Sequence, residues 1–123
     1  MTLSLEGIHT RIGASPIHHG VSLAVEPGEV VAILGSNGAG KTTGLRAIMG
    51  LLPLSAGRIM LDGQDISRLP PHERNARGLA FSPEGRRIFG PMTVRENLEL
   101  GAYGIGLSPG ELAASVEAMY AKF

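Results

Sequence analysis

The sequence predicts an α/β fold, of which these 123 residues provide an incomplete version. Alternating apolar residues near the N-terminus predict a small antiparallel β-layer. Segment 29–34, which is apolar from Val30 on, leads into a glycine-rich loop and then a helical pattern, which predicts the first part of a parallel core sheet. Two helix-start patterns in the last third of the chain predict the start of a helical subdomain.

The β-layer is predicted from period-two patterns and one turn signal. The apolar positions of the first two strands are Leu3, Leu5 and Ile8, followed by Val21, Leu23 and Val25. Segments 58–61 and 64–66 meet across Asp62-Gly63, which is a strong hairpin signal. We therefore expect half-buried antiparallel strands on both sides of the glycine-rich loop.

The glycine-rich loop matches the phosphate-binding pattern G-x-x-x-x-G-K-[ST] at every fixed position, which makes this a P-loop. Its residues are Gly35, Ser36, Asn37, Gly38, Ala39, Gly40, Lys41 and Thr42. Glycines allow successive backbone N–H groups to turn toward one anion, and the helix that follows directs its N-terminus at the same point. The loop predicts a P-loop NTPase fold that binds a nucleoside triphosphate.

The side chains at the end of this loop are expected to contact different parts of the bound nucleotide. Lys41 is expected to stabilise charge on the β- and γ-phosphates, and the Thr42 hydroxyl is expected to complete a Mg²⁺ shell. Thr43 is expected to be a supporting donor. The alternative interpretation is a plain strand-to-helix turn with a solvated lysine, which the four fixed positions disfavour. A small P-loop kinase or GTPase remains an alternative, although neither an Asn-Lys-x-Asp motif nor an arginine-rich lid is present.

Five further elements are predicted after the glycine-rich loop. The P-loop helix is expected over residues 41–49, and a short helix is expected to start at Pro70-Pro71 and end near Gly78. Residues 79–82 predict a short strand. Thr93 and Ser108 each stand three residues before a glutamate, which is capping-box spacing. The second of these helices carries an apolar stripe of Leu112, Val116, Met119, Tyr120 and Phe123.

Composition excludes several classes of function. Eleven basic and eleven acidic residues cancel, so no global positive field favours nucleic acid. The absence of cysteine excludes disulfides and thiolate metal sites. Apolar runs are far shorter than a membrane span, and the first residues lack a signal-peptide pattern. We expect a soluble, cytoplasmic chain without a membrane span of its own.

The order of these elements resembles the ATP-binding subunit of ABC transporters, and particularly the branch for branched-chain amino-acid uptake. The resemblance rests on segments 20–35, 57–66 and 92–98, with the P-loop inside the first. It implies one partial nucleotide-binding domain, its N-terminal half. Residues 1–91 would form the β-layer, P-loop core and Q-loop region, and residues 92–123 the start of the helical subdomain.

The same resemblance assigns two residues outside the loop. Segment 82–89 stands where the family carries its Q-loop, and Glu84 takes the position of the glutamine that approaches Mg²⁺. A carboxylate is a suitable Mg²⁺ ligand, and the alternative is a solvated loop carboxylate. Ile12 stands where the family usually stacks an aromatic ring on adenine. Nearby His18 and His19 are adjacent, so they are expected on opposite faces of a strand and exposed.

The resemblance also implies parts that this sequence lacks. There is no apolar strand ending in Asp-Glu, no later switch histidine and no signature segment, since the imitation at 107–111 is interrupted by Pro109. We therefore expect binding of Mg-ATP without useful hydrolysis. The alternative is a nucleotide-binding or interaction fragment that never hydrolyses. The implied partners are a second ATP-binding subunit and transmembrane permease subunits, at the inner face of the cell membrane.

Overall fold

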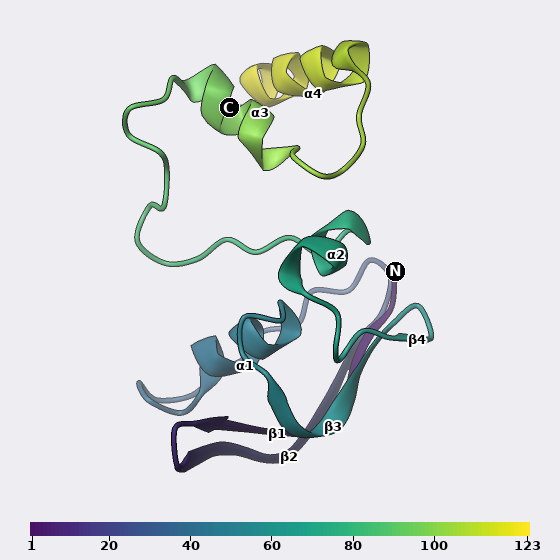
Figure 1. Cartoon of the computed structure of the whole chain (residues 1–123), viewed down its shortest axis with the longest axis vertical. Coiled ribbons are helices and arrows are strands. Elements are labelled where there is room, and N and C mark those ends of the chain that lie inside the picture. The colour runs from purple at the N-terminus through teal and green to yellow at the C-terminus, as the bar shows by residue number, and fades with distance from the viewer. The chain divides into compact units, whose positions relative to one another are not determined.

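The computed structural model describes all 123 residues, which form two compact units, residues 1–79 and 80–123 (Figure 1). The first unit holds β1 (Leu3–Ile12), β2 (Ser15–Val25), α1 (Lys41–Ile48), β3 (Leu54–Leu61), β4 (Gln64–Asp65) and α2 (Pro71–Ala76). The second unit holds α3 (Val94–Gly101) and α4 (Pro109–Lys122). None of these helices has the length and apolarity needed to cross a membrane.

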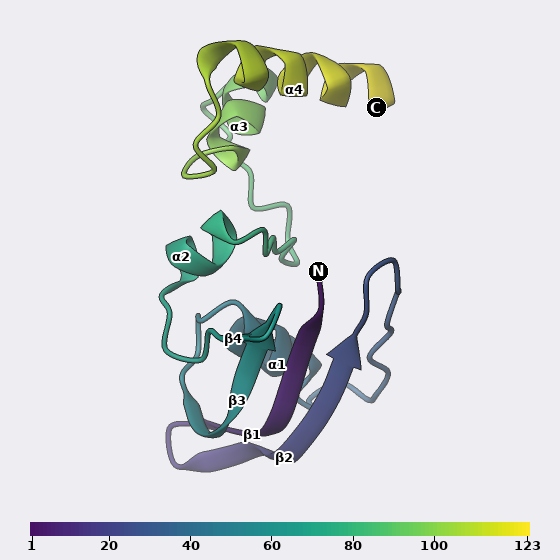
Figure 2. The ribbon, with the colours of Figure 1, turned by 90° about the vertical axis from the view of Figure 1, so that its right-hand side faces the viewer.

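The first unit is built on a four-stranded sheet in the order β2-β1-β3-β4, with every neighbouring pair antiparallel. Helix α1 lies against one face of this sheet (Figure 2). The predicted hairpin is confirmed, because β3 pairs with β4 across Asp62 and Gly63, both of which have positive φ angles. The antiparallel β-layer expected from the sequence is therefore present.

Two register shifts change which residues of β1 and β2 face the helix. Leu5 pairs with Leu23 and Ile8 pairs with Val21, so β1 carries one extra residue between these pairs. The next pair joins His9 to His19, so β2 carries one extra residue there in turn. A β-bulge inserts one residue without a partner and reverses the alternation beyond it. Simple alternation along either strand therefore fails to predict its inner face.

The core of the first unit lies between the sheet and α1. Its buried members are Leu5, Ile8, Ile48, Ile59, Leu61 and Ile66. Leu54, Leu69 and Leu79 pack against this cluster from the edges and are partly buried. This core fixes α1, and with it the start of the P-loop helix, against the β-layer.

Two predicted strands of the parallel core are wrong in this structure. Segment 29–34 has no strand pairing, and its Val30 and Leu34 are 96% and 89% exposed rather than buried. Segment 79–82 likewise forms no strand. A β-strand needs a paired strand to satisfy its backbone N–H and C=O groups, and no strand pairs with either segment. The apolar run is therefore not part of a sheet.

The second unit is a pair of helices with the predicted N-terminal caps. The Thr93 and Ser108 side chains each accept a hydrogen bond from the backbone N–H three residues on, and the Glu96 and Glu111 carboxylates accept one from the backbone N–H of the cap residue. Both capping boxes are confirmed. Arg95 of α3 forms an ion pair with Glu117 of α4 and lies over the Tyr120 ring. Of the predicted apolar stripe, Val116 is buried and Leu112 partly so, whereas Met119, Tyr120 and Phe123 are exposed.

Candidate phosphate-binding site

The glycine-rich loop has the backbone geometry that its sequence predicts. Gly38 and Gly40 have φ angles of 86° and 95°, a region that residues with a side chain rarely adopt. Ala39 N–H donates to the Ser36 carbonyl at 3.1 Å, which closes a turn, and Gly44 N–H donates to the Gly40 carbonyl at 2.9 Å, which begins α1. The loop therefore ends directly at a helix N-terminus.

Lys41 is the first residue of α1, and its ammonium group folds back over the loop. Its Nζ donates to the Gly35 carbonyl at 2.6 Å and to the Ser36 carbonyl at 2.8 Å. The positive charge of Lys41 is thereby held at the start of the glycine-rich loop, whose backbone N–H groups are predicted to bind an anion. An ammonium has three N–H donors, so one remains free for a phosphate oxygen.

The N-terminus of α1 carries a positive field that nothing in the helix neutralises. Gly40 caps the helix without a side-chain hydrogen bond, and the first turn holds no acidic residue. The first N–H groups of a helix lack partners within the helix and together with the helix dipole attract anions. Thr42, in the same turn, is exposed, so its hydroxyl is accessible to a metal ion or phosphate.

Strand β2 lies directly against this first turn. A Cβ placed on Gly40 would lie 2.9 Å from Ile17 Cγ2 and 2.9 Å from His18 Nε2. His18 Nδ1 in turn lies 2.7 Å from the hydroxyl oxygen of Thr10, which is fully buried. The expectation of two exposed histidines is therefore wrong for His18, which is half-buried under the loop, and right for His19. The reversed alternation beyond the bulge at Gly20 accounts for the difference.

The two residues assigned by resemblance occupy different units. Ile12 is the last residue of β1, paired with Ser15 at the end of the hairpin and 51% exposed. Its role beside adenine stays a prediction. Glu84 belongs to the second unit, and its approach to a Mg²⁺ ion held by Thr42 also stays a prediction.

Arg74 of α2 joins the far end of α1 to the chain that follows the hairpin. It is 2% exposed, and its guanidinium donates to the carbonyls of Ala47 and Ile48 at 2.9 and 2.7 Å. It also donates to the carbonyls of Ser67 and Leu69, both at 2.8 Å. Arg74 could not be predicted from the sequence, because carbonyl acceptors leave no pattern in it.

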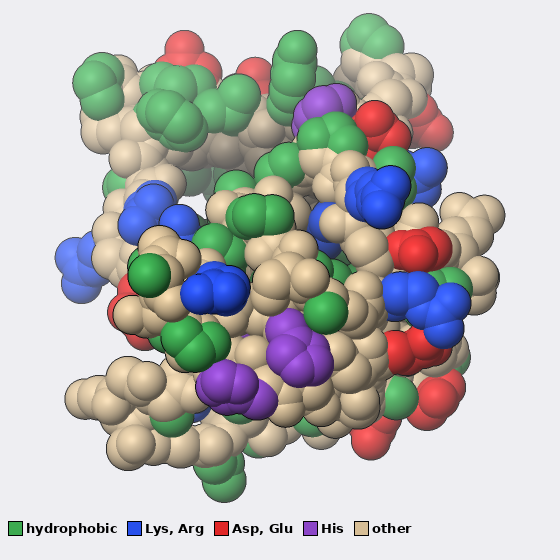
Figure 3. Space-filling model, turned by 60° about the horizontal axis from the view of Figure 1, so that its bottom comes forward, with side chains coloured by type: hydrophobic (Ala, Val, Ile, Leu, Met, Phe, Trp, Pro, Cys, Tyr) green, Lys and Arg blue, Asp and Glu red, His purple; other side chains and the backbone are tan.

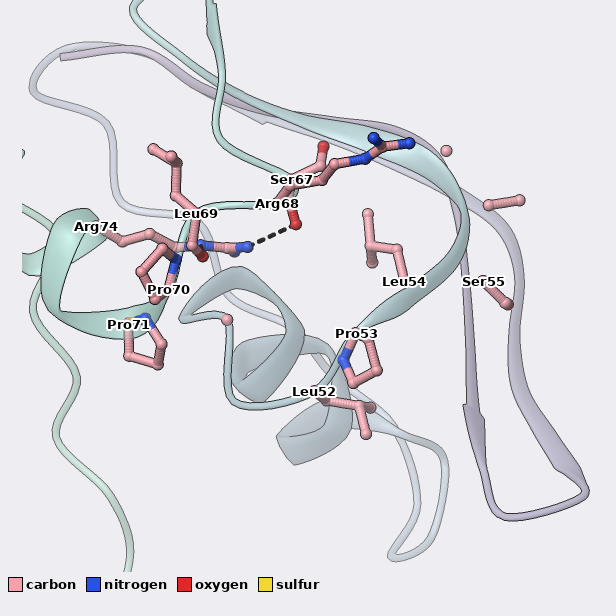
Figure 4. A pocket seen from close by; sticks show the side chains of 13 residues that line it. Leu52, Pro53, Leu54, Ser55, Ser67, Arg68, Leu69, Pro70, Pro71 and Arg74 are labelled. Atoms are coloured by element: carbon pink, nitrogen blue, oxygen red, sulfur yellow. Dashed lines mark hydrogen bonds between the residues drawn. The ribbon is translucent and has the colours of Figure 1, made fainter.

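A cavity of about 600 Å³ opens beside Arg74, between the loop after α1, the start of β3 and the approach to α2 (Figure 4). Figure 4 shows the Arg74 guanidinium directed at Ser67 rather than into open space. Burial lowers the pKa of Arg74, and the nearby Asp65 carboxylate partly offsets this. With its donors engaged by backbone carbonyls, Arg74 serves to hold α1 rather than to bind a ligand.

No single sign of charge dominates the face drawn in Figure 3, on which acidic and basic side chains are interspersed. This agrees with the equal numbers of acidic and basic residues. The positive field at the start of α1 is therefore local, and it comes from Lys41 and the helix terminus.

Comparison with known proteins places this site in a family. The family model for the ABC transporter matches residues 18–123, which include the whole glycine-rich loop. The chain belongs to the ABC transporter family. The predicted ATP-binding domain of an ABC transporter is thereby confirmed, and members of this family bind ATP, typically with Mg²⁺.

Curated ABC transporter relatives differ in what their names say they transport. The Fe(3+) ions import ATP-binding protein FbpC of Streptomyces coelicolor is 43% identical over 114 residues, 93% of this chain and 32% of the relative. The lipopolysaccharide export system ATP-binding protein LptB of Escherichia coli is 47% identical over 78 residues, 63% of this chain and 32% of the relative. The high-affinity branched-chain amino acid transport ATP-binding protein BraG of Pseudomonas aeruginosa is 38% identical over 101 residues, 82% of this chain and 43% of the relative.

Solved structures confirm the fold class. An ATP-binding subunit of an ABC transporter superimposes with a TM-score of 0.78 and 30% identity, over 89% of this chain and 45% of that one. The chain spans about a third to under half the length of the ABC transporter proteins it matches. The P-loop NTPase fold of the ABC ATPase type, present as a partial domain, is therefore established.

Proposed function

We propose that this chain is the ATP-binding portion of the energy-coupling subunit of an ABC importer. The observation that carries the proposal is the Lys41 ammonium held over the loop by the Gly35 and Ser36 carbonyls, beside a helix N-terminus without acidic neighbours. This arrangement offers a cation, free backbone donors and a favourable dipole to one polyphosphate. The whole loop from Gly35 to Thr42 would hold the phosphates, with Thr43 in support.

Magnesium and adenine would be held by side chains outside the loop backbone. Thr42 would supply a hydroxyl ligand to Mg²⁺, and Glu84 a carboxylate, both of which suit a hard cation. Ile12, exposed at the end of the β1–β2 hairpin, would pack on the adenine ring in place of an aromatic side chain.

The solute proposed is a branched-chain amino acid. Support comes from the segment Pro83-Glu84-Gly85-Arg86 and from the similarity to a relative named for branched-chain amino acid transport. Relatives named for iron import and lipopolysaccharide export are at least as similar, so the solute rests mainly on this segment. A second ATP-binding subunit and transmembrane permease subunits would be the partners, at the inner face of the cell membrane.

Titration with Mg-ATP by isothermal calorimetry tests the proposed ATP binding. The chain has only two lysines, Lys41 and Lys122, so each can be replaced in turn. Lys41→Ala should weaken ATP binding by about 10- to 100-fold, the range expected for a charge-assisted hydrogen bond. Lys122→Ala, a substitution at the end of α4, is the matched control and should bind ATP as the unchanged protein does. Equal binding by both variants would refute a role for the loop.

We further propose that these 123 residues bind ATP without turning it over. Phosphoryl transfer to water needs a group that positions the water, and the sequence has no apolar strand ending in Asp-Glu that would supply one. A magnesium-dependent phosphate-release assay on the chain checks this. Release that Lys41→Ala abolishes would contradict the proposal while leaving ATP binding intact.

A further inference from the structure

We propose that Asn37 of the phosphate-binding loop is a site of spontaneous deamidation, and that bound ATP protects it. Deamidation converts a neutral amide into a carboxylate, so the modified loop carries a negative charge where a polyphosphate is to bind. The chemistry at Asn37 depends only on the loop itself, whereas the protection by ATP rests on the proposed function.

Deamidation of an asparagine starts with an attack by the backbone nitrogen of the next residue. The Gly38 nitrogen, after losing its proton to solvent base, forms a bond to the side-chain carbonyl carbon of Asn37. The bond from this carbon to Nδ2 breaks, and ammonia leaves with a proton from solvent. Water then opens the succinimide ring at either carbonyl carbon, which leaves aspartate or isoaspartate at position 37. Glycine hinders this attack least, because it has no Cβ, and asparagine is among the thermolabile residue types.

The structure leaves both reacting groups of this pair accessible. Asn37 and Gly38 are exposed, and no atom beyond the chain neighbours lies within 4 Å of the position of a Cβ on Gly38. The Gly38 N–H donates no backbone hydrogen bond, since the turn is closed by the Ala39 N–H on the Ser36 carbonyl. Lys41 makes the side-chain hydrogen bonds of this loop, and the Asn37 amide makes none. The turn therefore exposes both groups to solvent and engages neither.

The other two asparagines of the chain are internal comparisons. Asn97 is followed by leucine, and its amide donates to three backbone carbonyls while its oxygen accepts from the Phe89 N–H at 2.9 Å. Asn75 is followed by alanine, and its amide donates to the Leu79 carbonyl at 3.3 Å. Both lie in helices, in which the next N–H belongs to the backbone hydrogen-bond ladder. Only Asn37 combines a following glycine with a free amide.

A carboxylate at position 37 opposes the binding of a polyphosphate. Ser36, the preceding residue, accepts a hydrogen bond from Lys41 Nζ at 2.8 Å, so a negative charge next to it competes with phosphate for this ammonium. The same charge repels the phosphates themselves, because they are to bind within this loop. Isoaspartate also adds a carbon to the backbone inside the turn. The modified loop should therefore lose affinity for ATP.

Bound ATP acts in the opposite direction, on the rate of deamidation. A polyphosphate in such a loop engages backbone N–H groups with its oxygens, and Gly38 lies in the middle of the loop. The attacking nitrogen is then held in the turn, so the reaction with the Asn37 side chain slows. Occupancy by ATP therefore preserves the loop that binds it.

Mass spectrometry of tryptic peptides, after incubation of the protein in Mg²⁺ buffer with and without ATP, tests the proposal. Cleavage after Arg11 and Lys41 gives a peptide of residues 12–41 in which Asn37 is the only amide side chain. This peptide should gain about 1 Da with time, and ATP should slow the gain several-fold. The peptide of residues 96–122, which holds Asn97, should not change. No gain in peptide 12–41, or an equal gain in both peptides, would overturn the proposed site.

Two variants isolate the effect of the charge. Asn37→Asp carries the charge of the product, whereas Asn37→Gln keeps a neutral amide and should show no mass gain over the same time. In calorimetric titration Asn37→Asp should bind Mg-ATP about tenfold or more weakly than Asn37→Gln, and equal binding would overturn the predicted loss of affinity.

The failure of this inference can be told apart from the failure of the proposed function. Equal mass gain with and without ATP, where calorimetry shows that ATP binds, would overturn the protection alone. If the unchanged protein does not bind ATP, the proposed function and the protection both fail. A mass gain at Asn37 without ATP would still support the site.

Discussion

Replacement of Arg74 by methionine should destabilise the first unit more than any other single substitution of a charged residue. Methionine keeps most of the side-chain volume and removes all of the donors. In the structure Arg74 is 2% exposed, and four backbone carbonyls from two separate segments, the end of α1 and residues 67–69, accept hydrogen bonds from its guanidinium. The substitution therefore tests whether a cation without a carboxylate partner holds α1 in place.

The expected magnitude follows from the acceptors that would lose their donor. Ala47 O keeps the hydrogen bond from Gly50 N–H at 3.0 Å. The other three acceptors, the carbonyls of Ile48, Ser67 and Leu69, have no second donor. A buried acceptor without a partner costs about 1–3 kcal/mol, and the loss of a buried cation returns part of this. We expect a decrease of about 3 kcal/mol in the free energy of unfolding.

Urea-induced unfolding followed by circular dichroism measures this decrease. Arg77→Met is the matched control, because Arg77 lies three residues on, is 39% exposed, and pairs only with Glu73 at 3.5 Å. Such surface pairs contribute about 0–1 kcal/mol. The unfolding free energy of Arg74→Lys should fall between those of the two methionine variants, since an ammonium has three N–H donors but a different shape from a guanidinium. Equal unfolding free energies for Arg74→Met and Arg77→Met would refute the reasoning.

Two further substitutions and one pH titration address the β1–β3 pairing and the N-terminal cap of α3. Gly57→Ala places a Cβ 2.4 Å from the Gly7 carbonyl oxygen at a φ of 86°, so it should lower the unfolding free energy by about 2 kcal/mol or more and weaken the β1–β3 pairing, as hydrogen exchange can show. Thr93→Ala should cost about 1 kcal/mol of helix stability, visible as lower ellipticity at 222 nm. Hydrogen bonds from the Thr93 backbone and hydroxyl lower the pKa of Glu96 below its ordinary 4.5, so this capping contribution is present above pH 4.5 and is lost as the pH falls through the folded value. A pH titration of ellipticity should show a loss below pH 4.5 that Thr93→Ala reduces; an identical titration in both proteins would contradict the assignment.

The local elements could be predicted because each depends on residues close together in the chain. The Asp62-Gly63 turn, the capping boxes at Thr93 and Ser108, and the start of α1 at Lys41 need only neighbours within about four residues. The same holds for the phosphate-binding loop, whose glycines and lysine act within eight positions. The backbone structure of each of these elements was confirmed, although ATP binding itself stays a proposal.

Strand status could not be predicted in the same way, since a strand is defined by its partners. The run 29–34 has the composition of a buried strand and yet is exposed and outside the sheet, because no strand pairs with it. The sequence pattern indicates only that this segment could pair as a strand. Only the tertiary arrangement decides whether the pairing is made.

The sequence by itself therefore predicted the glycine-rich loop, because short-range spacing specifies it. It also indicated the family, because segments 20–35, 57–66 and 92–98 follow one another in that family's order. The tertiary structure decided what surrounds the loop. Unpaired residues at Gly7 and Gly20 reverse the alternation of β1 and β2, which brings Thr10 and His18 beneath the loop. Backbone carbonyls far apart in the chain engage Arg74. Neither arrangement has a sequence signature, because bulges and carbonyl acceptors depend on the backbone rather than on residue type.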